Sequence, residues 1–87
     1  MFTWDEKKRA ANKIKHGVDF TTVEDFEFDA ALIHVDDRFD YGEVREVALG
    51  PIGWRLYVLV FTRRGDSVQV ISLRKANAKE EAAYGRR

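Results

Sequence analysis

The chain has 87 residues, with 15 Lys and Arg against 15 Asp and Glu and no cysteine. This length suits one domain with a single modest core, and the lack of cysteine excludes disulfides and thiolate metal sites. The longest apolar run, residues 56–61, is too short to cross a bilayer, and the first residues lack the basic-then-apolar pattern of a signal segment. We therefore expect one intracellular domain over residues 1–87.

The zero net charge hides three segments of different sign. Residues 1–18 hold five Lys/Arg and two Asp/Glu, residues 19–53 hold two and ten, and residues 54–87 hold eight and three. If folding brings the two basic segments together, the molecule has a positive face suited to nucleic acid and a negative face suited to a basic protein. The alternative is that the charges interleave in space.

The first predicted helix runs from a capping box at residues 3–6 to about Lys15. Gly17, which follows His16, ends it because glycine readily takes the left-handed backbone conformation. The residues expected to face the core are Trp4, Ala11 and Ile14.

A second helix is predicted to begin at Asp19 or Thr21 and to end at Asp29. Its inward residues are expected to be Phe20, Val23, Phe26 and Ala30. A strand at residues 32–35 follows, then a polar loop at 36–42 and a second strand at 43–49. Residues 50–53, which include the only proline, are predicted to form a turn.

Residues 54–75 are predicted to form the central hairpin of the sheet, because two runs rich in Val, Leu, Ile and aromatics flank a tight turn at residues 65–66. The simplest register pairs Arg64 with Ser67, Val60 with Ile71 and Tyr57 with Arg74. In that register the core face consists of residues 56, 58, 60, 71 and 73. The other face would end in a polar group made of Arg55, Tyr57, Ser72 and Arg74. The first strand is apolar on both sides, so we expect it inside the sheet.

A last helix is predicted to begin at Asn77, with a capping box formed with Glu80, and to end at Gly85. Ala83 and Tyr84 can pack its inner side against the domain. The element order is therefore two helices, four strands and one helix. Consecutive strands on short connections predict an α+β fold with a four-stranded antiparallel sheet and helices on one side or end.

Four carboxylates in and beside the polar loop raise the question of a metal site. They lack the spacing of a calcium loop, and neither histidine has the spacing of a zinc ligand pair. We therefore predict no metal and no cofactor. Solvated turn carboxylates, one of them paired with an arginine, explain the group Asp36, Asp37, Asp40 and Glu43.

The basic residues suggest phosphate chemistry. Cleavage of RNA without metal needs a base for the 2′-hydroxyl, cations for the charge on phosphate and an acid for the leaving oxygen. Arginine suits the second role because it binds phosphate through two parallel hydrogen bonds. The candidates are Glu43 or His16 for the base, Arg64 and Arg74 for the cations, and Lys75 or Tyr84 for the acid or a positioning group.

These residues also have structural explanations. Lys15 and His16 stabilise the C-terminal end of a helix dipole without any catalytic role. The arginines can be rim residues whose stems lie over the sheet.

Four short sequence blocks carry a family resemblance. They are F-x-W-D at 2–5, K-H-G-V-x-F at 15–20, Y-G-E-x-R at 41–45 and I-S-x-R-K-A at 71–76. Together, in this order, they resemble the BrnT toxin family over almost the whole chain. Two positions depart from the family pattern, Leu73 in place of Ala and Asn77 in place of Thr. Asn is as good a helix cap as Thr, so neither change threatens activity.

The resemblance implies a RelE-like fold and a toxin of a type II toxin–antitoxin system. Such a protein is a bacterial, cytoplasmic endoribonuclease that cuts RNA and arrests translation. It is neutralised by a BrnA-like antitoxin, which also supplies binding to operator DNA, and no membrane partner is implied. With the chemistry above, the candidate catalytic residues are Arg64, Arg74, Glu43, Tyr84 and His16. The candidate RNA-binding residues are Lys15, Lys75, Arg55 and Tyr57.

A second interpretation is a non-catalytic module that binds nucleic acid or a partner protein through the same basic face. Sheet-based RNA binders expose aromatic side chains on which bases stack. Tyr57 and Phe61 fall on one face of a predicted strand and could serve in this way. In either interpretation an antitoxin or partner is expected to cover the basic surface, with Trp4, Tyr57 and Arg74 as anchors, or to bind the acidic 19–53 segment.

Overall fold

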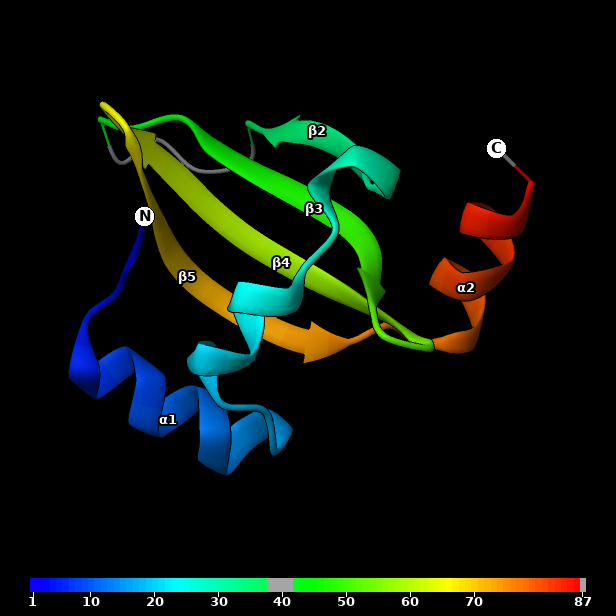
Figure 1. Cartoon of the computed structure of the whole chain (residues 1–87), viewed down its shortest axis with the longest axis horizontal. Coiled ribbons are helices and arrows are strands. Elements are labelled where there is room, and N and C mark those ends of the chain that lie inside the picture. Colours follow the sequence, from blue (N-terminus) through cyan, green and yellow to red (C-terminus); the bar gives the residue numbers. More distant parts are fainter. Residues whose placement is uncertain (38–41, 87) are drawn as a thin grey trace.

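A five-stranded mixed sheet organises the part of the chain that the computed structural model describes, residues 1–37 and 42–86 (Figure 1). The strands are β1 (Phe2–Thr3), β2 (Leu32–Asp36), β3 (Arg45–Ile52), β4 (Arg55–Arg64) and β5 (Ser67–Lys75), in the spatial order β1-β5-β4-β3-β2. The helices are α1 (Glu6–His16), α2 (Ala78–Gly85) and two short 3-10 helices, η1 (Phe20–Asp25) and η2 (Phe28–Ala30).

The predicted α+β class is confirmed, with two differences in the elements. Strands β2 to β5 are antiparallel in chain order, as predicted, but β1 adds a fifth strand that runs parallel to β5. The hairpin strands β4 and β5 lie inside the sheet, as expected. The prediction of two N-terminal helices is wrong, because α1 is followed by 3-10 turns. Three β-branched residues in a row, residues 21–23, disfavour a regular α-helix there.

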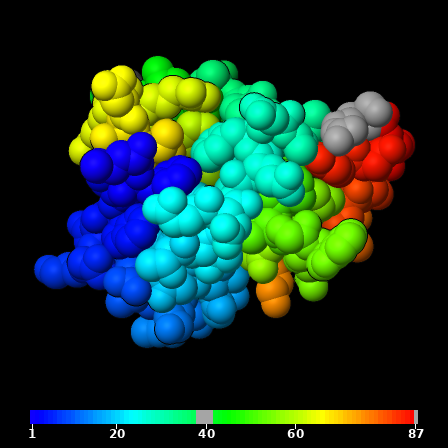
Figure 2. Space-filling view, in the orientation of Figure 1, coloured from blue at the N-terminus to red at the C-terminus, as the bar shows by residue number. Residues whose placement is uncertain are grey.

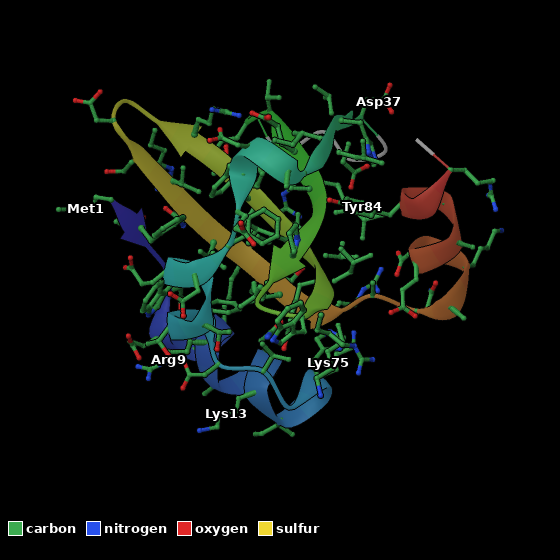
Figure 3. All side chains as sticks on the ribbon, turned by 45° about the vertical axis from the view of Figure 1, so that its right-hand side comes forward. Met1, Arg9, Lys13, Asp37, Lys75 and Tyr84 are labelled. Atoms are coloured by element: carbon green, nitrogen blue, oxygen red, sulfur yellow. The ribbon has the colours of Figure 1, made fainter. Side chains whose placement is uncertain are left out.

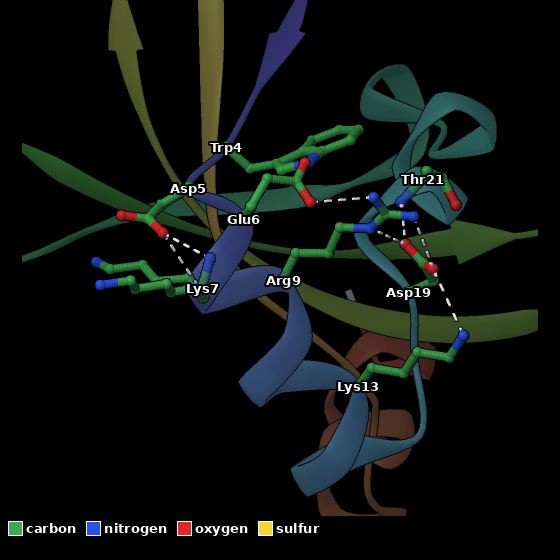
Figure 4. Close-up of polar contacts among 9 residues, drawn as sticks. Trp4, Asp5, Glu6, Lys7, Arg9, Lys13, Asp19 and Thr21 are labelled. Atoms are coloured by element: carbon green, nitrogen blue, oxygen red, sulfur yellow. Dashed lines mark hydrogen bonds and ion pairs between the residues drawn. The ribbon is translucent and has the colours of Figure 1, made fainter.

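Helix α1 is capped two residues later than predicted and packs through a different face. Asp5 accepts hydrogen bonds from the N–H groups of Lys7 (2.7 Å) and Lys8 (3.3 Å), so Asp5 rather than Thr3 begins the helix (Figure 4). The predicted end at Gly17 is confirmed by its left-handed backbone (φ 71°). Ile14, expected in the core, is 87% exposed.

The buried residue of α1 is Asn12, whose amide completes the edge of β5. Its side chain donates to the carbonyl of Leu73 (2.7 Å) and accepts from the N–H of the same residue (3.2 Å), as a neighbouring strand would. It also donates to the carbonyl of Val18. Strand β1 pairs with β5 only at residues 68 and 69. Helix α1 therefore supplies hydrogen-bond partners to the backbone of β5 at Leu73, beyond the two residues that pair with β1.

The 3-10 segment covers the core. Asp19 caps η1 by accepting from the N–H of Thr21, and the predicted inward residues Phe20, Val23 and Phe26 are buried. The space-filling view shows this segment, in cyan, lying across the middle of the molecule beside the blue N-terminal part (Figure 2).

Strand β3 runs longer than predicted, because residues 50–52 continue the strand and the turn falls at 53–54. Gly50 is needed here for close packing rather than for a turn. A Cβ at this position would lie 2.8 Å from the Cβ of Ala31 and 2.9 Å from a ring carbon of Phe26. Pro51 accepts a hydrogen bond from the N–H of Glu27 through its carbonyl, which fastens the 3-10 segment to the sheet.

The hairpin contains a β-bulge. Arg64 lies opposite Ser67, as predicted. Ile71 has no partner on β4, so Val60 lies opposite Ser72. The predicted pairs of Val60 with Ile71 and of Tyr57 with Arg74 are therefore wrong. An extra residue in one strand shifts the alternation of side chains by one position.

The faces of β4 are exchanged relative to the prediction, and on β5 the bulge changes the alternation, so that Val70 and Leu73 both face the core. The core consists of residues from the predicted polar face together with Leu73; the fully buried members are Leu59, Phe61, Val70 and Leu73. Tyr57 packs against this core, opposite Lys75. Arg74 and Ser72 lie on the other face, opposite Val58 and Val60. The predicted polar group of residues 55, 57, 72 and 74 does not form.

Candidate functional site

The sheet face opposite the core is the candidate site. On β4 it carries residues 58, 60, 62 and 64, and on β5 it carries residues 72 and 74, which lie opposite 60 and 58. At the end where α2 begins, a cleft of about 420 Å³ opens over this face. Its lining residues are His34, Val35, Asp36, Asp37, Val47, Val58, Arg74 and Glu80.

Arg74 is held at this cleft by the first turn of α2. Its Nη1 and Nη2 groups donate to the two carboxylate oxygens of Glu80, both at 2.8 Å. The side chains are 34% and 27% exposed. The hydrogen bonds raise the pKa of the Arg74 guanidinium and lower the pKa of the Glu80 carboxyl. The site therefore carries a fully charged arginine.

Arg64 forms a similar pair at the other end of the open face. Its Nε and Nη2 groups donate to Glu43, both at 2.9 Å. The hydrogen bonds from Arg64 lower the pKa of the Glu43 carboxyl, and the charges of Arg45 and Lys8 lower it further. Glu43 is therefore a weak base at neutral pH. Both side chains are about half exposed, so the pair itself adds little to stability.

Helix α1 brings His16 and Lys15 to the edge of β5. They line a shallow cleft of about 210 Å³ together with Lys8, Ala11, Asn12, Ile71 and Ser72. The pKa of His16 is lowered first by burial and then by the positive charges of Lys15 and Arg74. His16 is therefore mainly neutral at pH 7 and able to accept a proton.

Arg64 and Arg74 share a face but are far apart. Arg74 lies opposite Val58, which is six positions from Arg64 along β4. At about 3.3 Å per residue, this places their backbones roughly 20 Å apart. Each guanidinium is bound to its own carboxylate, Glu43 for Arg64 and Glu80 for Arg74, so the two arginines form separate groups on this face.

The remaining sequence candidates lie elsewhere. The hydroxyl of Tyr84 donates to the carbonyl of Ala30 at 2.6 Å, and this side chain points from α2 toward the sheet (Figure 3). Tyr57 and Lys75 lie opposite each other on the core side of the hairpin, and Arg55 is exposed near the β3–β4 turn. The structure thus places His16 and Lys15 in one cleft and His16 within electrostatic range of Arg74. It pairs Glu43 with Arg64 and sets Tyr57 opposite Lys75.

Two residues that line these clefts were not among the candidates chosen from the sequence. His34 lines the same cleft as Arg74, and Lys8 lines the cleft of His16. Lys8, Asn12 and Lys15 have the spacing i, i+4, i+7, which puts them on one helix face. This pattern could have identified Lys8 from the sequence. For His34 no comparable signal exists, because its neighbours across the sheet depend on the register.

The acidic-loop residues that the structure describes have different surroundings. Asp36 is buried at the end of β2, Glu43 binds Arg64, and Asp40 lies outside the described residues. Over residues 1–37 and 42–86 no three His, Asp or Glu side chains are grouped as a metal site requires. In the same residues no helix has the length and apolar character to cross a membrane.

Comparison with known proteins defines the class of protein to which this fold and site belong. Residues 4–80 match the family described as the ribonuclease toxin BrnT of type II toxin–antitoxin systems. The chain therefore belongs to the BrnT toxin family, as the sequence blocks indicated. It is similar to the crystal structure of the Brucella abortus ribonuclease toxin BrnT, with 32% identity, 88% of this chain and 97% of that chain covered, and a TM-score of 0.71. No match was found among curated proteins.

Proposed function

We propose that this member of the family is a metal-independent endoribonuclease that inhibits translation by cutting RNA. The observation that carries the proposal is the position of Arg74, which lies at a cleft on the open sheet face and close enough to His16 to lower the pKa of that histidine. A charged arginine beside a neutral histidine provides a phosphate ligand and a proton acceptor.

The proposed chemistry needs no group beyond these side chains and the RNA. Neutral His16 removes the proton of a 2′-hydroxyl, the 2′-oxygen attacks the adjacent phosphorus, and the bond to the 5′-oxygen breaks. The imidazolium formed in the first step returns its proton to the leaving 5′-oxygen. Arg74 and Lys15 stabilise the negative charge that develops on the phosphate oxygens.

The other candidates act at a distance in this proposal. Arg64, roughly 20 Å away, contacts a phosphate further along the strand, with Glu43 holding its guanidinium. Tyr84 holds α2 against the carbonyl of Ala30, and so supports the cleft from the side of Glu80. The exposed cations Lys75 and Arg55 attract RNA through charge.

Family membership supports the rest of the proposal. A type II toxin implies an antitoxin, which we propose to be BrnA-like and to supply the binding to operator DNA. We also propose that the protein acts in the bacterial cytoplasm, where its RNA substrate is found.

The alternative of a non-catalytic module loses one of its supports. In that interpretation Tyr57 and Phe61 could stack on RNA bases. Phe61 is fully buried and Tyr57 packs against the core, so neither side chain forms a stacking platform on the open face.

The test is cleavage of RNA by the purified chain in the presence of EDTA. We expect cleavage products with 2′,3′-cyclic phosphate ends, because a 2′-hydroxyl attack leaves that product. Arg74→Ala, prepared in the same way, is the control for a contaminating nuclease. Cleavage that requires added Mg²⁺, or equal cleavage by Arg74→Ala, would contradict the proposal.

A further inference from the structure

The guanidinium of Arg74 is held in a different way from those of Arg9, Arg63 and Arg64. Glu80 occupies its outer edge, formed by Nη1 and Nη2. In Arg9, Arg63 and Arg64 the carboxylate instead occupies the side edge, formed by Nε and Nη2. Within residues 1–37 and 42–86, the side edge of Arg74 therefore keeps Nε–H and one N–H of Nη2 without a hydrogen-bond partner.

Helix α2 fixes Glu80 itself. One carboxylate oxygen accepts from the backbone N–H of Asn77 at 2.9 Å, and the N–H of Glu80 donates to the Asn77 side chain at 2.8 Å, which makes a capping box. Nη1 of Arg74 also donates to the carbonyl of Lys75 at 3.3 Å. The outer edge of the guanidinium is thus bound to a helix cap and to the main chain, so the plane of the group is fixed relative to the sheet.

We infer that Glu80 is a positioning residue, which fixes Arg74 so that the side edge of its guanidinium receives an RNA phosphate. This inference rests on the proposed function. The side edge offers two parallel N–H donors, the arrangement that binds two phosphate oxygens. The phosphate can bind there without displacing Glu80. Donors that are fixed before the reaction stabilise developing charge better than mobile ones.

The first test separates turnover from binding. Glu80→Gln keeps the capping box, since Gln serves at this helix position, but loses the charge and one acceptor for Arg74. We expect kcat to fall about tenfold because the guanidinium is less well oriented. KM for RNA should not rise, because the positive charge of Arg74 is no longer partly neutralised by a neighbouring carboxylate. An unchanged or higher kcat would show that Glu80 only masks Arg74 and would overturn the inference.

A matched control comes from another carboxylate–arginine pair. Glu46 accepts from Nε and Nη2 of Arg63 at 2.6 and 3.1 Å, and neither residue lines the cleft of Arg74. Glu46→Gln therefore breaks a carboxylate–arginine pair that lies outside the cleft of Arg74. Its kcat should stay at the parent value, and an equal fall in both variants would mean that Glu80 has a merely structural role.

A second measurement does not depend on cleavage. The Nε–H resonances of the arginines can be followed by NMR while a 2′-deoxy oligonucleotide, which cannot be cleaved, is added to the parent protein. We expect Arg74 to shift on saturation and Arg63, whose Nε–H is bound to Glu46, to stay in place. If the parent cleaves no RNA, the proposed function fails, and this titration still decides whether the side edge binds phosphate. An unshifted Arg74 would overturn the inference.

Discussion

Arg74 is the residue on which the proposed chemistry depends most. Its planar guanidinium lines the cleft and binds Glu80 through the edge formed by Nη1 and Nη2, and a lysine has no second edge. Arg74→Lys should therefore lower kcat/KM for RNA cleavage roughly 100-fold, the cost of removing one donor to a developing charge. Thermal unfolding should change little, and Arg63→Lys serves as control. Full activity of Arg74→Lys would contradict the proposal that both edges of the Arg74 guanidinium are needed.

His16 gives the proposal a pH dependence. Burial and nearby positive charge keep its pKa below the usual 6.5, so the base is already neutral at pH 7. Activity should be level between about pH 7 and 8 and should fall as the pH drops through the lowered pKa. The His16→Asn variant should lose about 100-fold in kcat, and its remaining activity should no longer fall as the pH drops. A pH–rate profile of this variant that keeps the parent's shape would exclude His16 as the base.

The same pKa shift has a consequence for stability. The unfolded chain binds a proton at His16 more readily than the folded chain does, because the folded pKa is the lower one. The contribution of His16 to stability is therefore lost as the pH falls from about 6.5 to the folded pKa, and it is constant above and below that window.

At the scale of elements, several local signals in the sequence were reliable. The turn at residues 65–66, the glycine after α1 and the capping box of α2 were all predictable, because each depends on a few neighbouring residues. Arg64 and Arg74 were chosen from the sequence for their chemistry, which does not depend on register, and their roles stay predictions.

Features that depend on distant residues were not predictable. The bulge at Ile71 puts both Val70 and Leu73 on the core side of β5, and residues 67–75 alone do not indicate it. The role of Asn12 requires a strand edge that lies 61 residues later in the chain. For the same reason the sequence placed Tyr57 beside Arg74, whereas the structure places it against the core.

The packing of the 3-10 segment on β3 makes a prediction of its own. Gly50→Ala would bring a methyl group within 3 Å of Ala31 and Phe26, both of which are enclosed by other groups. We expect the free energy of unfolding to fall by about 1–3 kcal/mol, the usual cost of overpacking. Gly85→Ala, where an added Cβ meets nothing within 4 Å, should leave the stability unchanged or raise it slightly. Equal stability of the two variants in urea unfolding would show that the β3 backbone moves to make room for the added methyl group.

At the scale of the whole molecule, the charges partly interleave. The acidic 19–53 segment supplies the partners of Arg9, Lys13, Arg63 and Arg64 in ion pairs (Figure 4 shows the first two). The prediction of two clean faces of opposite sign is therefore wrong for these four cations. In the described residues Lys8 and Lys15 make no ion pair, and both line the cleft beside β5. Lys8 and Lys15 thus give the cleft beside β5 a positive charge.

This distribution indicates where an antitoxin could inhibit. Of the predicted anchors, Trp4 and Tyr57 pack against the core, which leaves Arg74 as the anchor on the open face. An antitoxin that covers the open face and the edge of β5 excludes RNA directly, whereas one that binds only the acidic segment leaves this surface accessible. We expect direct exclusion, because the cations of the cleft attract acidic groups of either partner.

The measurement is a competition between antitoxin and an uncleavable 2′-deoxy oligonucleotide. At saturating antitoxin, binding of the oligonucleotide should fall at least tenfold, and Arg74→Ala should weaken binding of both ligands. Glu46→Gln, which lies outside the cleft of Arg74 and that of His16, should change neither. If the saturated complex binds the oligonucleotide as tightly as the free toxin does, the antitoxin acts from another surface, and the open face of the sheet is not its binding site.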